Sequence, residues 1–195
     1  MLIRLYNDNL NPKHLQKIVD ILQGGGVIIY PTDTIYGIAC CLSEQKAMQR
    51  IAKIKGRHNA TSFSLICKDI AQASQYCKPI SNDIFKEMKS VLPGPYAFIL
   101  EVNNQVPKLF CHNKRNIGIR IPNNLICMAI VEKLGLPLVS TSIEIDENEP
   151  EYSTDPGLIY EKYENIVDMV IDGGYGSIED STIIDCSNSK PIITT

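Results

Sequence analysis

The chain has 195 residues, of which 44% are hydrophobic and 21% charged, and its formal net charge is −3 at pH 7. These values predict one soluble globular domain over residues 1–195, with room for a sizeable core. They argue against a generally basic nucleic-acid-binding surface, and no apolar run approaches the ~20 residues of a membrane span. Because the N-terminal segment also lacks the pattern of a secretory signal, we expect a cytoplasmic protein with no membrane partner.

The first half of the chain predicts helices and strands in alternation. Asn11 and Pro12 are typical of a helix start, apolar residues then recur at helical spacing, and glycines 24–26 end the helix. Further helices are expected to begin at the N-cap residues Ser43, Asp69 and Ser81. Strands are expected at residues 27–30, 35–42 and 63–67.

The second half continues this alternation. A Pro-Gly-Pro turn at 93–95 leads into a strand, a helix over 125–134 is closed by Gly135, and an acidic stretch after Ser142 is expected to be a solvated loop. Asp155 and Pro156 start another helix. The expected strands lie at residues 96–102, 116–121, 138–139, 167–171 and 182–184. Strands that alternate with helices favour an α/β sheet covered by helices.

The cysteines predict reduced thiols and no structural metal site. There are seven, they form no CxxC pair, and several lie in apolar runs, where a free thiol behaves as a small hydrophobe. Only Cys111 and His112 adjoin as candidate metal ligands. The sequence also lacks the P-loop, the dinucleotide-binding glycine motif and the zinc-protease and serine-hydrolase motifs.

Four segments carry groups suited to ligand binding, and each also has a plainer interpretation. Thr32 and Thr34 lie just after a strand, where a polar turn is the alternative. Lys55 and Arg57 could hold neighbouring phosphate oxygens or form a solvated basic helix end. Arg120 interrupts an apolar strand, so it either contacts a ligand or makes a salt bridge at the rim.

The fourth segment is the hydroxyl run Ser140-Thr141-Ser142 at the carboxyl end of a strand. Open α/β sheets bind ligands at such ends, although an ordinary serine-rich turn has the same composition. No histidine lies near these hydroxyls in sequence, so we interpret them as hydrogen-bonding groups and not as nucleophiles.

Taken together, these segments resemble the YrdC-like family, which includes the threonylcarbamoyl-AMP synthases. The matching pieces, in chain order, are GGGVIIYPTDTIYGIAC, KGR, LPGPYAFIL, NIGIRIP, LPLVSTS and IDGGYGSIEDSTIID. The resemblance implies an open, twisted, mixed sheet with helices on both faces and a concave ligand cleft. It also implies a nucleotidyltransferase activity that joins L-threonine, bicarbonate and ATP, with Mg²⁺, to threonylcarbamoyl-AMP for transfer RNA modification.

The resemblance implies roles for individual residues as well. Lys55 and Arg57 would hold the ATP phosphates, and Arg120 would face the threonine carboxylate. The implied catalytic residues are Lys55, Arg57 and Ser142. The implied ATP-binding residues are Lys55, Arg57, Asn116, Ser142, Glu144 and Thr182. The implied threonine-binding residues are Thr32, Thr34, Tyr36, Arg120 and Ser181.

Several departures from the family pattern make the chain look closer to the YciO-like branch. Glu144 replaces the asparagine of the SxN motif, His58 replaces a proline, and Ala97 replaces a threonine. Glu144 could repel phosphate or help to bind Mg²⁺. The alternative function is therefore a protein of the same fold that binds a nucleotide or double-stranded RNA without efficient synthesis. A third hypothesis is a hydrolase that acts on an acylated nucleotide or a carbamoyl group. Any contact with RNA is expected to be weak.

Overall fold

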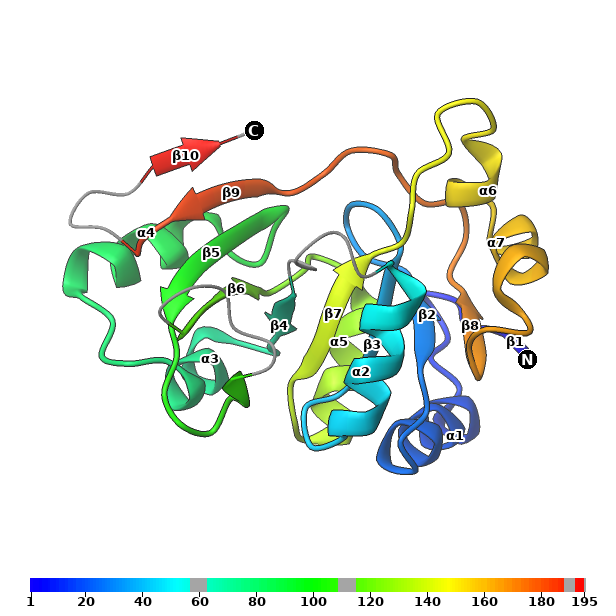
Figure 1. The fold of residues 1–195 in the computed structure, drawn as a ribbon, viewed down its shortest axis with the longest axis horizontal. Coiled ribbons are helices and arrows are strands. Elements are labelled where there is room, and N and C mark those ends of the chain that lie inside the picture. Colours follow the sequence, from blue (N-terminus) through cyan, green and yellow to red (C-terminus); the bar gives the residue numbers. More distant parts are fainter. Residues whose placement is uncertain (57–62, 109–114, 188–191, 195) are drawn as a thin grey trace.

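The computed structural model describes residues 1–56, 63–108, 115–187 and 192–194. Their strands form one mixed sheet in the order β1-β8-β2-β3-β7-β4-β6-β5-β9-β10 (Figure 1). The strands are β1 (Leu2–Arg4), β2 (Ile28–Tyr30), β3 (Gly37–Cys41), β4 (Ser64–Ile66), β5 (Tyr96–Glu101), β6 (Asn116–Arg120), β7 (Leu138–Ser142), β8 (Met169–Asp172), β9 (Thr182–Asp185) and β10 (Ile192–Thr194). The expected α/β fold with an open, mixed sheet is confirmed.

Helices cover both faces of the sheet, as expected. α1 and α5 pack against each other on one face, while α2 lies on the opposite face (Figure 1). The helices are α1 (Pro12–Gln23), α2 (Gln45–Ile54), α3 (Ile70–Tyr76), α4 (Asn82–Val91), α5 (Leu125–Leu134), α6 (Glu151–Thr154) and α7 (Pro156–Tyr163). No helix in the described ranges is long and apolar enough to cross a membrane.

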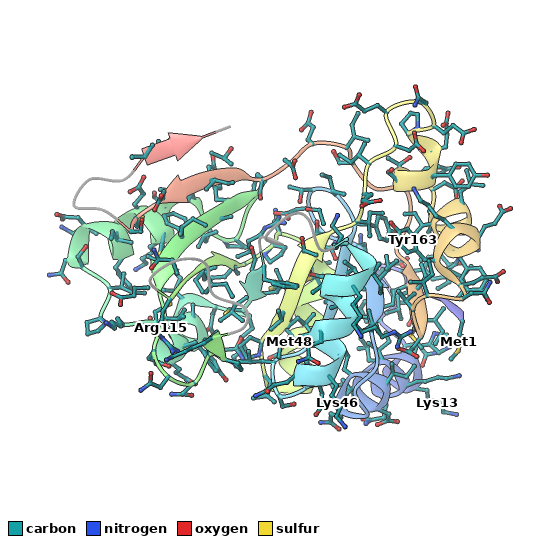
Figure 2. The ribbon with its side chains drawn as sticks, in the orientation of Figure 1. Met1, Lys13, Lys46, Met48, Arg115 and Tyr163 are labelled. Carbon is teal, nitrogen blue, oxygen red and sulfur yellow. The ribbon has the colours of Figure 1, made fainter. Side chains whose placement is uncertain are left out.

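Alternation along the strands builds two hydrophobic cores, one on each face. Ile29 joins the core beneath α2, whereas its neighbours Ile28 and Tyr30 join the core beneath α1 and α5. This is the period of two that a strand imposes on its side chains. Met48 on α2 is fully buried against the first core (Figure 2).

Most of the helix ends lie where the local sequence predicted them. Asn11, Asp69 and Ser81 cap their helices, since each side chain accepts a hydrogen bond from a backbone N–H of the first turn. Gly135 closes α5 with a positive φ of 74°. Ser43 was expected to cap α2 but does not: the cap is Glu44, and the Ser43 hydroxyl donates to the Glu44 carboxylate at 3.2 Å.

Three short elements depart from the expectations. β1 and β10 were not predicted; each has three residues and lies at an edge of the sheet. The acidic stretch after Ser142 is a largely exposed loop up to Pro150, as expected, but the four-residue helix α6 begins at its last acidic residue, Glu151. The Ser153 hydroxyl holds it in place, because it donates to the Glu144 carbonyl at 3.1 Å and accepts from the Asp146 backbone N–H at 3.1 Å.

Candidate functional site

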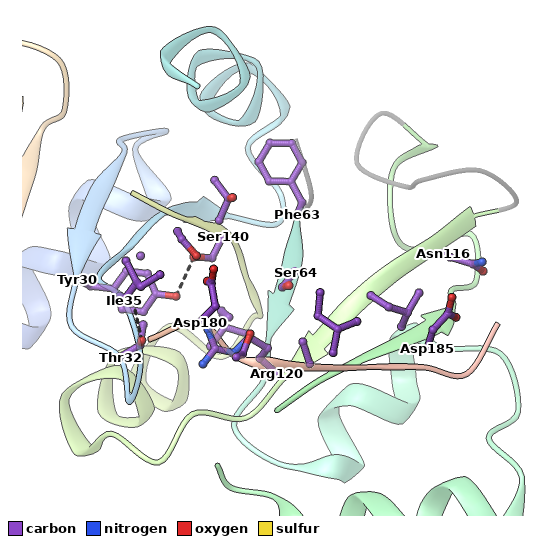
Figure 3. A pocket seen from close by; sticks show the side chains of 18 of the residues that line it. Tyr30, Thr32, Ile35, Phe63, Ser64, Asn116, Arg120, Ser140, Asp180 and Asp185 are labelled. Carbon is purple, nitrogen blue, oxygen red and sulfur yellow. Dashed lines mark hydrogen bonds between the residues drawn. The ribbon is translucent and has the colours of Figure 1, made fainter. Parts of the chain in front are cut away.

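A cleft of about 700 Å³ opens on the sheet face that α1 and α5 cover elsewhere (Figure 3). The strand register explains its floor. Ser140 on β7 pairs with Ser64 on β4, Ser64 pairs with Gly118 on β6, and this row continues across β5 and β9. Directly opposed residues on neighbouring strands share a face. The row in order is Ser140, Ser64, Gly118, Ile99 and Asp185.

Small residues keep this floor low. A Cβ on Gly118 would lie 2.5 Å from the Ser64 hydroxyl oxygen, and one on Gly37 would lie 2.7 Å from the Tyr30 ring. Both distances are too short for any side chain. Glycine at these two positions therefore makes room for the Ser64 hydroxyl and the Tyr30 ring to lie close against the sheet.

Arg120 lies two residues after Gly118 on β6, so it points to the same face of the sheet, and it is 8% exposed. Its Nη2 donates to the Asp33 carboxylate at 2.9 Å and to the Thr34 hydroxyl at 3.0 Å. Its buried Nε has no hydrogen-bond partner among the described residues. The sequence left open a ligand contact or a rim salt bridge; the structure has an ion pair that is buried and borders the cleft.

The loop after β2 positions this arginine. Asp33 also accepts a hydrogen bond from the Asn123 backbone N–H at 2.9 Å, which fixes the carboxylate between two elements. Thr34 is buried and does not line the cleft, so its contact with Arg120 makes it a positioning residue. Thr32 does line the cleft, and its hydroxyl donates to the Ile35 carbonyl at 2.8 Å.

Tyr36 is not among the residues that line the cleft. Its hydroxyl donates to the Gly174 carbonyl at 2.7 Å and accepts from the Gly173 N–H at 3.2 Å. Burial raises the pKa of this phenol well above its ordinary value. Both hydrogen-bonding functions of the hydroxyl are thus used in joining the loop to the turn after β8.

The hydroxyls on β7 differ in availability. Tyr30 donates to the Ser140 hydroxyl at 2.9 Å, and Ser140 donates to the Ile38 carbonyl at 3.2 Å, so Ser140 is occupied. Ser142 lines the cleft next to Gly37, and its hydroxyl has no hydrogen bond to any described residue. Of these two serines, Ser142 is the one available to a ligand.

Lys55 is the C-cap residue of α2, lies outside the cleft lining, and is close to two carboxylates. Burial of the half-buried ammonium lowers the pKa of Lys55, and the negative charges of Glu144 and Asp180 partly oppose this shift. Asp180 lines the cleft, whereas Glu144 is exposed and lies outside the lining. Arg57, the other expected phosphate ligand, lies outside the described residues.

The residues of β9 that line the cleft differ from those expected from the sequence. Ser181 lines the cleft together with Ile183 and Asp185. Thr182 does not, because alternate residues of β9 point to opposite faces. Asn116 lines the cleft at the far end of β6 from Arg120. Sequence reasoning missed Asp180 and Asp185, although the spacing 181, 183, 185 was a signal for a shared face.

Comparison with known proteins identifies the family of this chain. The model of the Sua5_yciO_yrdC family, described as "Telomere recombination", matches residues 20–194. The chain belongs to the Sua5/YciO/YrdC family. It is 36% identical to YciO of Escherichia coli strain K12 and 34% identical to a Haemophilus influenzae protein, in each case over 97% of this chain and 91% of the relative.

Solved structures extend the comparison. The crystal structure of E. coli YciO matches with a TM-score of 0.90 and 34% identity, over 100% of this chain and 94% of that one. The structure of P. abyssi Sua5 complexed with L-threonine matches with a TM-score of 0.87 and 20% identity, over 99% of this chain but only 56% of that one. At that identity the second match shows a shared fold.

The charges around the cleft are mixed. Among described residues that line it, Arg120 is already paired with Asp33, and Asp180 and Asp185 are acidic. No group of three or more histidine, cysteine, aspartate or glutamate side chains in the described ranges could hold a metal ion by itself. A Mg²⁺ ion at Asp180 or Glu144 would complete its coordination with waters or with oxygens of a bound phosphate chain.

Proposed function

We propose that this protein binds L-threonine and Mg²⁺-ATP in the cleft and joins them with bicarbonate to give threonylcarbamoyl-AMP and pyrophosphate. The observation that carries the proposal is Arg120. A buried guanidinium with an unsatisfied Nε is costly, since an unpaired buried donor costs about 1–3 kcal/mol. A ligand carboxylate that displaces Asp33 or re-orients the guanidinium would satisfy it, and guanidinium groups bind carboxylates through paired hydrogen bonds. The L-threonine complex of the similarly folded Sua5 supports threonine as the source of that carboxylate.

The remaining groups fit the two chemical steps. The neutral amine of threonine attacks the bicarbonate carbon and water leaves, giving a carbamate. A carbamate oxygen then attacks the α-phosphorus of ATP, the bond to the bridging oxygen breaks, and pyrophosphate departs. Ser142 and Ser181 offer hydroxyls along this path, and Lys55 offers a cation for the leaving pyrophosphate. No covalent bond to the protein is needed, so positioning carries most of the rate acceleration.

Mg²⁺ supplies charge neutralisation of the phosphate chain when it is bound. The chain's own contribution at this end is Lys55, with the carboxylates of Asp180 and Glu144 nearby. Those carboxylates weaken the attraction of the site for a bare triphosphate but suit a magnesium complex of it.

The test is pyrophosphate release from Mg²⁺-ATP with and without L-threonine, in bicarbonate buffer. We expect release that depends on threonine, and we expect Arg120→Lys to raise the threonine concentration needed by about tenfold or more, since lysine cannot reproduce the guanidinium fork. Arg50→Lys is the matched control. Arg50 also pairs with a carboxylate, Asp168, at 2.6 Å, but lies outside the cleft lining.

A second candidate is nucleotide binding without efficient synthesis, and the two carboxylates near Lys55 favour it. It predicts ATP binding by calorimetry but no pyrophosphate release above the threonine-free rate. Double-stranded RNA binding is disfavoured, because the chain has a net negative charge and two of its carboxylates, Asp180 and Asp185, line the cleft. Hydrolysis of an acylated nucleotide would instead release product without ATP.

A further inference from the structure

Asp180 brings a negative charge into the cleft. It lies in the segment that links β8 to β9, is exposed, and lines the cleft beside Ser181. In the described part of the chain no hydrogen bond and no ion pair uses its side chain. The carboxylate is therefore available to a cationic group of a ligand.

The position of Asp180 relates it to two cations. Figure 3 shows it between Ser140 on β7 and Arg120 on β6, and all three residues line the same space. Its negative charge is also close enough to Lys55 to act on the pKa of that amine. Asp180 thus lies near the residue proposed to bind the threonine carboxylate and near the cation proposed to bind phosphate.

The covalent order of the product determines which group lies between those two cations. In threonylcarbamoyl-AMP the carboxylate and the nitrogen are both attached to the α-carbon, and the nitrogen is attached to the carbonyl carbon that carries the phosphate. With its carboxylate at Arg120 and its phosphate at Lys55, the ligand has its nitrogen between them. In the free amino acid this nitrogen is an ammonium group, and charge-assisted hydrogen bonds to a carboxylate are the strong ones.

The other carboxylates near the cleft are less suited to this nitrogen. Asp33 is outside the cleft lining and already accepts hydrogen bonds from Arg120 and Asn123. Glu144 also lies outside the lining. Asp185 is on β9, two strands from β6, which is about 10 Å across a sheet with strands ~4.8 Å apart. The Arg120 guanidinium points away from β9, toward the loop after β2.

Resting on the threonine binding of the proposed function, we propose that Asp180 binds the α-ammonium group of the amino-acid substrate and makes the cleft specific for α-amino acids. The charges of Arg120, Asp180 and Lys55 alternate in sign, as do the carboxylate, ammonium and phosphate groups that they face. The contact survives loss of one proton from the nitrogen, because a neutral amine keeps two N–H donors. A carboxylic acid without the amine leaves Asp180 unpaired and is rejected for that reason.

The test compares L-threonine with (R)-3-hydroxybutanoate, which is threonine without its amino group. By calorimetry, the wild-type protein should bind threonine more tightly by at least about tenfold, or 1.4 kcal/mol. Asp180→Asn should reduce this ratio to about threefold or less, because the carboxamide keeps the shape of the side chain but loses its charge. Both ligands carry the carboxylate and the hydroxyl, so the ratio isolates the contact with the amine.

Glu179→Gln is the matched control. Glu179 precedes Asp180, carries the same charge and is also exposed, but it lies outside the cleft lining. The control should leave the ratio within about twofold of the wild-type value, since an exposed charge outside the cleft is screened by water and salt. Equal falls of the ratio in the two variants would assign the effect to the overall charge of the segment and overturn the inference.

Binding of Mg²⁺-ATP separates this role of Asp180 from a role in binding the metal. A loss of Mg²⁺-ATP affinity in Asp180→Asn that added Mg²⁺ restores, with an unchanged threonine ratio, would overturn the inference in favour of the metal. Equal binding of the two acids by the wild-type protein would overturn the inference alone. Failure of both acids to bind would overturn the proposed function with it. The expected ratio without threonine-dependent pyrophosphate release would overturn the proposed synthesis and support the role of Asp180.

Discussion

One face of the sheet is used in two ways. Where α1 and α5 cover it, the strands present side chains such as Ile28, Ala39 and Ile171 to the helices. Where no helix covers it, the strands present Ser64, Arg120 and Asp185 to the cleft. The sheet itself is continuous across the boundary. Polar residues in an otherwise apolar strand therefore mark the place where the covering helix is absent, and the uncovered part is where a ligand can bind.

The boundary itself is held by a buried ion pair. The side chains of Arg120 and Asp33 are 9% and 10% exposed, so loss of either partner leaves a charge buried without compensation. Asp33→Ala should lower the free energy of unfolding by about 3–5 kcal/mol, measured by urea denaturation. The control is Glu101→Ala, which breaks the exposed Lys78–Glu101 pair and should cost at most about 1 kcal/mol. Equal losses for the two variants would show that the pair at Arg120 is as well solvated as one on the surface.

Substitutions that remove buried side chains should lower the stability of the protein where helices cover the sheet, whereas substitutions on the open cleft floor should change it little. Ile130 on α5 is fully buried in the core beneath the helices, so Ile130→Ala should cost about 2–5 kcal/mol and lower the melting temperature by roughly 2–4 °C per kcal/mol. Ser64 lies on the open floor, and Ser64→Ala should change stability by about 0.5 kcal/mol or less. Comparable losses in thermal melts would mean that the cleft floor is packed like a core.

The contrast also explains which features the sequence could predict. Asn11, Asp69 and Ser81 act within one helical turn, so local pattern was sufficient to place them. Alternation placed Arg120 on one face of its strand, but its partner Asp33 is 87 positions away and only the fold brings them together. The strand β10 is short and gains its place by pairing with β9, which no local signal encodes.

In the candidate site, too, the sequence predicted local features but not contacts between distant parts of the chain. Thr32, Ser142 and Arg120 were expected in the cleft and line it. Tyr36 was expected there too, but its hydroxyl is used by Gly173 and Gly174, about 137 residues along the chain. Such a contact depends on the strand order β8-β2-β3, which composition and spacing do not determine.

The lowered pKa of Lys55 predicts that ATP affinity depends on pH. Because burial lowers the pKa of Lys55, its ammonium loses its proton at a lower pH than an ordinary lysine, and its attraction for phosphate is lost as the pH rises through that lowered pKa. We expect ATP affinity to fall as the pH rises toward the ordinary lysine pKa of 10.5, with the fall beginning at a lower pH than that value, where the phosphates stay ionised. Lys55→Arg should flatten this dependence, because arginine stays charged. An equally steep fall in the variant would assign the titration to another group.

The smallest expected effect concerns Glu144, which lies at the rim and outside the cleft lining. Its carboxylate is near enough to Lys55 to raise the pKa of that amine, so it also acts on a phosphate bound there. The side chain is exposed, and charges in water interact by only about 1 kcal/mol even at ~4 Å, less in salt. Glu144→Gln keeps the shape and the backbone carbonyl that accepts from Ser153. ATP affinity at low salt should therefore rise about two- to threefold, and the gain should disappear in about 0.5 M salt. If Glu144 instead supports Mg²⁺, calorimetry across a Mg²⁺ series will show weaker binding that added Mg²⁺ restores. An unchanged affinity at low salt would place the Glu144 carboxylate too far from the phosphates to matter.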